Sequence, residues 1–132
     1  ANQESIATKT GFLYVSTDGG VNWTQSASAG ERNWSDVASS ADGVNLSACD
    51  DGGYVYTSID TGSNWTQQVT SGIRDWNSIS VSGDSAKIVG ALRDCTIFTS
   101  PDDGTTWADS GDICEKSGIF RFQLLTTSWT AD

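Results

Sequence analysis

Three cationic residues recur at a constant spacing and are the first candidates for chemistry in this chain. Arg32, Arg74 and Lys116 are spaced by 42 residues, in a chain with only seven Lys and Arg residues. If the fold brings them to one end, they form a positive surface that attracts a carboxylate, a sulfate or an acidic side chain. The alternative is that the cations were inherited from a duplicated ancestor and that each pairs with a neighbouring acid.

Two tryptophans follow the first two cations. Trp34 and Trp76 each lie two residues after an arginine. An exposed indole at this position can stack on a sugar ring, so both are candidate ligand-binding residues together with the three cations. The other interpretation is that each indole packs inside the fold, because aromatic side chains dominate protein cores.

The chain lacks the residue types that many catalytic sites require. It contains no histidine, which excludes a Ser-His-Asp triad, a Cys-His dyad and a histidine metal ligand of its own. A glycosidase needs two opposed carboxylates, and the spacing of the acidic residues singles out no such pair. We therefore expect no catalytic residue, no metal site and no cofactor, and we predict that the chain is not an enzyme.

The net charge of −10 excludes further classes of partner. Sequence-independent binding to nucleic acid and binding to anionic membranes both need a basic surface, so we expect neither. The apolar runs are about five residues long, whereas a membrane-spanning helix needs ~20 residues. We therefore also expect no membrane insertion.

An internal repeat of 42 residues organises the chain. One motif, S-x-D-x-G-x-x-W, occurs at residues 16–23, 58–65 and 100–107. Its members are Ser16, Asp18, Gly20 and Trp23; Ser58, Asp60, Gly62 and Trp65; and Ser100, Asp102, Gly104 and Trp107. We interpret residues 1–132 as a single domain with repeats at about 11–52, 53–94 and 95–132.

The residue types of this motif predict a tight structural turn. The serine hydroxyl and the aspartate carboxylate can accept hydrogen bonds from backbone N–H groups, and glycine permits a positive φ angle. We expect the three tryptophans to return on the next strand, to pack over the hairpin and to be largely buried.

Each repeat predicts four short antiparallel strands. In the copy that begins at Trp34 we expect strands at 34–39, 44–49, 54–57 and 64–69, separated by turns rich in Gly, Asp and Asn. No window has the spacing of an amphipathic helix. A four-stranded unit of about 40 residues has the size of one β-propeller blade, so the predicted fold is all-β.

The turn motif resembles the Asp-box of the BNR-repeat β-propellers. That superfamily includes sialidases, endoglucanases, sortilin-type receptors and photosystem II assembly factors. The resemblance covers residues 11–125 and implies that the motif is structural and lies away from any catalytic site. The segments that start at Trp34 and Trp76, Trp-x-x-Val/Ile-Ala/Ser, are similar to the assembly-factor branch.

The predicted strands amount to three blades, whereas closed propellers have about four to eight. We therefore predict a homodimer that closes a six-bladed ring, in which a strand at residues 119–125 completes the first blade of the partner. If the rotation does not close, the same ends produce a filament. The alternative is that the chain is a fragment of a longer propeller.

Several features favour a secreted or extracellular protein. The chain starts with alanine, as after cleavage of a signal peptide, and its three cysteines form no CxxC pair. We predict a disulfide between Cys95 and Cys114, which belong to the same repeat, and leave the state of Cys49 open. In a secreting eukaryote, four sequons would be glycosylation candidates: Asn22, Asn33, Asn45 and Asn64.

Together these observations favour a non-catalytic binding propeller that recognises glycans like a lectin, through repeated weak sites in an oligomer. The alternative is a protein-binding scaffold, as the similarity to photosystem II assembly factors implies, with the cationic face docking an acidic partner. A structural subunit of an extracellular assembly is a further alternative, and a fragment of a glycoside hydrolase ranks last.

Overall fold

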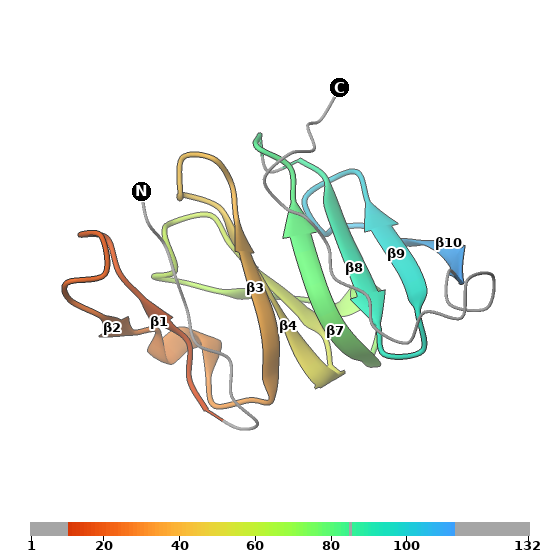
Figure 1. The fold of residues 1–132 in the computed structure, drawn as a ribbon, viewed down its shortest axis with the longest axis horizontal. Coiled ribbons are helices and arrows are strands. Elements are labelled where there is room, and N and C mark those ends of the chain that lie inside the picture. The colour runs from red at the N-terminus through yellow and green to blue at the C-terminus, as the bar shows by residue number, and fades with distance from the viewer. Residues whose placement is uncertain (1–10, 85, 113–132) are drawn as a thin grey trace.

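The computed structural model describes residues 11–84 and 86–112 (Figure 1). These residues form antiparallel strands, and their only helical segments are two 3-10 turns, η1 (Ala27–Ala29) and η2 (Val69–Ser71). The predicted all-β fold is therefore confirmed for this part of the chain. Within the same residues, no helix has the length and apolar character needed to cross a membrane.

The strands fall into three successive units, which Figure 1 shows from left to right. The first unit is a hairpin of β1 (Tyr14–Val15) and β2 (Thr24–Gln25). The second unit contains β3 (Trp34–Ser39), β4 (Leu46–Gly53), β5 (Val55–Ser58) and β6 (Thr66–Gln68). The third unit contains β7 (Arg74–Val81), β8 (Ile88–Leu92), β9 (Thr96–Ser100) and β10 (Ala108–Asp112).

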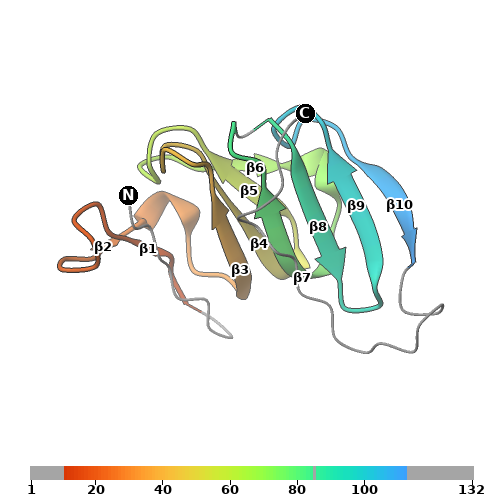
Figure 2. The ribbon, with the colours of Figure 1, turned by 45° about the horizontal axis from the view of Figure 1, so that its top comes forward.

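Within each unit, strands that are neighbours in the chain pair antiparallel, as the repeat predicts. The strand expected at 34–39 coincides with β3, and the other three expected strands of that repeat overlap β4, β5 and β6. β4 also pairs with β7, through Asp51 opposite Asp75 and Gly53 opposite Arg74. This pairing joins the second and third units into one curled sheet of eight strands, with β4 beside β7 in Figure 2.

The hydrophobic core lies between successive units. One cluster joins the segments of the first unit to the second, and its members are Leu13, Ala29, Trp34, Ala48 and Tyr56. A larger cluster joins the second unit to the third, and its members are Cys49, Val55, Trp76, Ile79, Val81, Ile88, Leu92 and Phe98. Each cluster therefore packs residues of two successive units together.

Two hydrogen bonds tie the first strand of the second unit to the first strand of the third. Ser35 Oγ donates to the carbonyl oxygen of Trp76 at 2.8 Å. The backbone N–H of Ile79 donates to the Asp36 carboxylate at 2.9 Å, and burial raises the pKa of this carboxyl group. The contact between these units is therefore fixed by polar groups as well as by apolar packing.

Several predicted features lie outside the described residues. They are Cys114 of the expected disulfide, Lys116 of the cationic set and the strand expected at residues 119–125. The disulfide with Cys95, the third cation and the strand exchange therefore stay predictions. Cys49, whose state the sequence left open, is a buried free thiol.

Candidate functional site

The two described cations of the repeat are anchored within their own units. Arg32 Nε donates to the carbonyl oxygen three residues earlier at 3.0 Å, and Arg32 Cζ lies 4.5 Å from the centre of the Tyr56 ring. Arg74 repeats both contacts, at 2.9 Å to the carbonyl oxygen and 4.2 Å to the Phe98 ring. Both side chains are half-buried, and neither forms an ion pair with a described acid. A guanidinium stacked on an aromatic ring is a packing group, which weakens the expectation of an anion-attracting surface here.

The two tryptophans that follow these arginines are core residues. Trp34 is 2% exposed and Trp76 is fully buried. Each indole nitrogen donates to a glycine carbonyl oxygen four residues earlier at 3.3 Å. Each ring packs edge-on against an aromatic ring of its own unit. Neither indole offers a face to a sugar in this structure, so the packing interpretation describes both residues.

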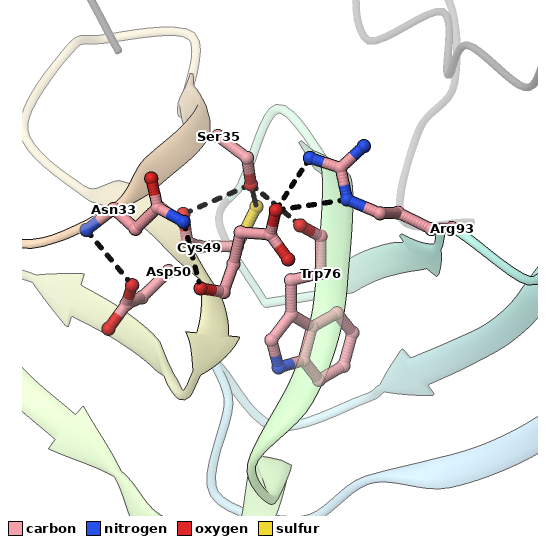
Figure 3. Close-up of polar contacts among 7 residues, drawn as sticks. Asn33, Ser35, Cys49, Asp50, Trp76 and Arg93 are labelled. Atoms are coloured by element: carbon pink, nitrogen blue, oxygen red, sulfur yellow. Dashed lines mark hydrogen bonds and ion pairs between the residues drawn. The ribbon is translucent and has the colours of Figure 1, made fainter. Parts of the chain in front are cut away.

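A polar network occupies the end of the sheet where β4 leads into β5 (Figure 3). Arg93 Nη2 and Nε contact Asp51 Oδ2 at 2.5 and 2.9 Å, and the Arg93 side chain is 57% exposed. The backbone N–H of Asn33 donates to Asp50 at 3.2 Å. Positions 51 and 93 are one repeat apart, so this ion pair joins the same position of two successive units. Sequence reasoning missed the pair because an acid and a base at equivalent positions look like divergence of the repeat.

The thiol of Cys49 is chemically inert in its surroundings. Its Sγ lies 3.2 Å from Ser35 Oγ, and burial raises the pKa of the thiol to about 12. A thiol with this pKa is protonated at neutral pH and is a poor nucleophile and metal ligand. Among the residues that the structure describes, no group of three or more His, Cys, Asp and Glu could hold a metal ion.

The three S-x-D-x-G-x-x-W segments form the same turn. In each, the serine Oγ accepts the backbone N–H of the glycine at 2.8–2.9 Å and donates to the aspartate at 2.9 Å. The aspartate accepts the backbone N–H four residues later at 2.8–2.9 Å, and the glycine φ angles are 88–89°. These hydrogen bonds hold the pKa of all three carboxyl groups below its usual value, at about 2 for Asp18. The geometry agrees with the structural role expected of the motif.

The tryptophans of these turns differ in burial although their local structure is the same. Each indole nitrogen donates to the carbonyl oxygen of the motif's glycine at 2.9–3.2 Å. Trp23 is 39% exposed, whereas Trp65 and Trp107 are half-buried. The expectation that all three are largely buried is wrong, because burial here depends on the neighbouring unit and not on the motif.

Two of the sequon asparagines belong to these turns. Asn22 and Asn64 each donate the side-chain amide to the aspartate of their own turn at 2.8 Å. Asn33 donates its amide to a backbone carbonyl oxygen at 3.3 Å, and Asn45 is half-buried. Their glycosylation stays a prediction, while the asparagines of the turns have a structural role of their own.

A second serine–aspartate turn follows the first strand of both four-stranded units. Ser40 Oγ donates to Asp42 and Ser82 Oγ donates to Asp84, both at 2.7 Å. The two hydroxyls also accept the backbone N–H five residues later at 3.0–3.1 Å. Sequence reasoning expected only a turn between the strands at 34–39 and 44–49, although the 42-residue spacing of these pairs could have revealed the second motif.

A groove of about 680 Å³ lies between the first hairpin and the turn at residues 58–65. We call it the hairpin groove. Its lining is mainly hydroxyl and amide side chains: Thr17, Asn22, Thr24, Gln25, Ser26, Ser28, Thr61 and Ser63, together with Val15, Ala27 and Gly62. Among the described residues, Asp18 is the one charged residue that lines it. A volume of this size is typical of small-molecule binding sites.

Ser26 leaves the hairpin groove open because its side chain is small. Its Oγ donates to the Gly62 carbonyl oxygen and accepts the Trp65 indole N–H, the latter at 2.7 Å. Gln68 stands at the same position one repeat later and donates to a threonine hydroxyl of β5 at 2.7 Å. Its Cγ lies 3.1 Å from the place that a Cβ on Gly104 would occupy. The longer side chain thus fills the equivalent space between the second and third units.

The comparisons with known proteins give structural similarity without a family. No family model matches the chain, and no curated protein matches it. A GH74 enzyme from Niastella koreensis is 27% identical over 82% of this chain, with a TM-score of 0.64. A YCF48 structure with a bound D1 peptide is 15% identical over 82% of the chain, with a TM-score of 0.68. A GH74 xyloglucanase from Xanthomonas campestris is 14% identical over 77%, with a TM-score of 0.59.

The chain spans only part of each of these proteins. It covers 16% of the Niastella enzyme, 36% of the YCF48 chain and 20% of the xyloglucanase. GH74 enzymes and YCF48 are β-propeller proteins. The curled antiparallel sheet and these similarities support a β-propeller fold, of which the described residues form a part.

Proposed function

We propose that the chain is a non-catalytic binding segment of a β-propeller and that the hairpin groove binds a neutral glycan. The observation that carries this proposal is the lining of the groove by hydroxyl and amide groups, which donate and accept hydrogen bonds as sugar hydroxyls do. Asp18 adds an acceptor to the lining, and its negative charge repels anionic sugars. Both features favour a neutral sugar.

The proposal of a non-catalytic role rests on how the candidate reactive groups are engaged. The carboxylates of the three repeated turns accept hydrogen bonds from their own backbone, which suits a structural role. The Cys49 thiol is buried and protonated. Binding without turnover is therefore the activity that we propose for this chain.

Replacing Ser26 by glutamine tests the hairpin groove, because Gln68 shows that the repeat accepts glutamine at this position. We expect Ser26→Gln to weaken binding of a neutral xyloglucan oligosaccharide by about tenfold or more, since the longer side chain fills the groove. The matched variant Gln68→Ser opens the equivalent space and should raise the number of oligosaccharides bound. Isothermal titration calorimetry measures both the affinity and the stoichiometry.

The control is the fold of both variants, followed by far-UV circular dichroism and urea unfolding. Ser26→Gln should keep the β-sheet spectrum, since glutamine occupies the same position in the next repeat, at Gln68. Unchanged affinity of folded Ser26→Gln would rule out the groove as the site. No binding by the wild type across a panel of neutral glycans would rule out the proposed function.

We further propose that each chain contributes three blades to a six-bladed homodimeric ring located outside the cell. The 42-residue repeat and the apolar character of residues 119–125 support this arrangement. Such a ring would carry several grooves and would raise the apparent affinity for a multivalent glycan. A filament is the alternative if the rotation between chains does not close.

A second candidate function is that of a protein-binding scaffold. The structure of YCF48 with a bound D1 peptide favours it, and Arg93, which is 57% exposed while it pairs with Asp51, offers N–H donors at the end of the sheet. Fluorescence anisotropy with a labelled acidic peptide tests this function. We expect Arg93→Glu to abolish peptide binding and Ser26→Gln to leave it unchanged. Peptide binding that is insensitive to Arg93→Glu would argue against this role for Arg93.

A further inference from the structure

The first hairpin has an exposed aromatic face, whereas the equivalent face of the second unit is buried. Tyr14 and Trp23 are 37% and 39% exposed. Tyr56 takes the place of Tyr14 one repeat later, is only 4% exposed and packs in a cluster with Leu13 of the first unit. The aromatic face of the second unit is thus covered by the first unit. The described residues provide no such cover for the face of the first hairpin.

The glycine of the repeated turn shows the same difference. Gly62 is buried, and a Cβ there would lie 2.8 Å from Val15 Cγ2 of the first hairpin. Gly104 is buried in the same way against the second unit. Gly20 is exposed, and the nearest neighbour of such a Cβ would be the Trp23 ring of its own turn at 3.9 Å. A preceding unit therefore covers the second and third turns but not the first.

The third unit carries the surface that provides this cover elsewhere. Ser110 stands two repeats after Ser26 and is exposed on β10. Its hydroxyl lies 3.2 Å from the hydroxyl of Thr99, which stands two repeats after Val15. Ser26 and Val15 are among the residues that contact the turn of the following unit. The third unit thus presents small side chains where the first unit uses Ser26 and Val15.

One buried hydroxyl of the third unit has no hydrogen-bond partner among the described residues. Ser78 is 8% exposed, and its Oγ has no hydrogen-bond partner among the described residues. Asp36, at the same position one repeat earlier, accepts the backbone N–H of Ile79 from the following unit. The Ser78 hydroxyl is therefore left for a group outside the described residues.

We call the exposed surface of the first hairpin at Tyr14, Gly20 and Trp23 the Trp23 face. The surface of the third unit at Thr99 and Ser110 is the Ser110 face. We propose that a second copy of this chain supplies the missing neighbour, so that the Trp23 face of one copy binds the Ser110 face of the other. The occupant is a second copy because these two faces are the two halves of a contact that the chain makes twice within itself. A two-fold axis would satisfy both faces of both copies at once. The contact includes a hydrogen bond from Trp23 Nε1 to the partner's Ser110 Oγ, as Trp65 makes with Ser26. This inference rests on the homodimer proposed above and names its contact surfaces, and it is independent of the glycan proposal.

The mass of the full 132-residue chain in solution tests the proposal, measured by size-exclusion chromatography with light scattering at several concentrations. We expect the wild type to have twice the mass of one chain. Trp23→Arg and Ser110→Arg each place a bulky charge in the contact and should reduce the mass to that of one chain. Val69→Arg is the matched control, because Val69 is 63% exposed and belongs to neither face. It should keep the mass of the wild type.

Mixing the two variants distinguishes loss of the contact from loss of the fold. A Trp23→Arg chain keeps its Ser110 face, and a Ser110→Arg chain keeps its Trp23 face. The mixture therefore retains one intact contact and should form heterodimers, although each variant alone is monomeric. Since Ser110 is exposed, Ser110→Arg keeps the test valid even if Trp23→Arg fails to fold.

Assemblies of any size that each variant alone reduces to single chains, with heterodimers in the mixture, support the two faces. A wild type that is monomeric at all concentrations overturns the proposal. An oligomer that persists in both variants also overturns it, because another surface must then hold the copies together.

Discussion

Replacing Trp76 by alanine should lower the free energy of unfolding by about 3–5 kcal/mol. Trp76 is fully buried between the second and third units, with ring centres 5.8 Å from Phe98 and 5.6 Å from Trp107. Alanine leaves a cavity in the larger of the two core clusters, and the hydrogen bond from the indole nitrogen to Gly72 is lost. Urea unfolding followed by far-UV circular dichroism measures the change.

The control for this substitution is Val69→Ala. Val69 is 63% exposed, and its truncation should change the free energy of unfolding by no more than about 0.5 kcal/mol. If Trp76→Ala costs as little as Val69→Ala, the packing between units is not what stabilises this part of the chain, and the core described above is wrong.

The position of the Trp76 indole explains why residue 90, in β8, is a glycine. A Cβ on Gly90 would lie 2.6 Å from the Trp76 ring. Ala48 occupies this position one repeat earlier and packs in the cluster that contains Trp34. The third unit therefore has glycine in place of alanine at this position, because the Trp76 ring leaves no room for a methyl group. Aligning the repeats shows the change from alanine to glycine but not its cause.

The repeated turns could be predicted from the sequence because their contacts are local. Ser58, Asp60 and Gly62 lie within five residues of one another, so their types and order already determine which hydroxyl, carboxylate and backbone N–H meet. The strands could be predicted for a similar reason, since short apolar runs between Gly- and Asp-rich turns favour antiparallel pairing.

The candidate site could not be predicted because it depends on contacts between distant segments. The stacking of Arg32 on Tyr56 joins residues 24 positions apart, and their spacing alone does not show that the guanidinium is engaged. The hairpin groove depends on Ser26 standing where the next repeat has Gln68, a difference that looks conservative in polarity. Side-chain volume at one inter-unit position, and not a change of motif, decides whether the groove is open.

Replacing Asp36 by alanine should cost about 1–3 kcal/mol, because the backbone N–H of Ile79 then loses its acceptor inside the contact between units. The size of this loss should depend on pH. Burial raises the pKa of Asp36 above its usual value, so the folded state holds this proton more tightly than the unfolded chain. The contribution of Asp36 to stability is therefore complete below the unfolded pKa of about 3.9 and falls as the pH rises through the folded pKa.

The measurement is the difference in unfolding free energy between the wild type and Asp36→Ala, which should be larger at pH 4 than at pH 7. The aspartates of the repeated turns have lowered pKa values, and the stability that they contribute is lost in acid. They are the same in both proteins, so their effect cancels in the difference. A difference that grows towards pH 7 would show that the hydrogen bonds from Ile79 and Val37 outweigh burial at this carboxylate. Asp36→Ser, which introduces the hydroxyl found naturally at Ser78, has no carboxyl group to titrate at this position, so its stability relative to Asp36→Ala should not change with pH.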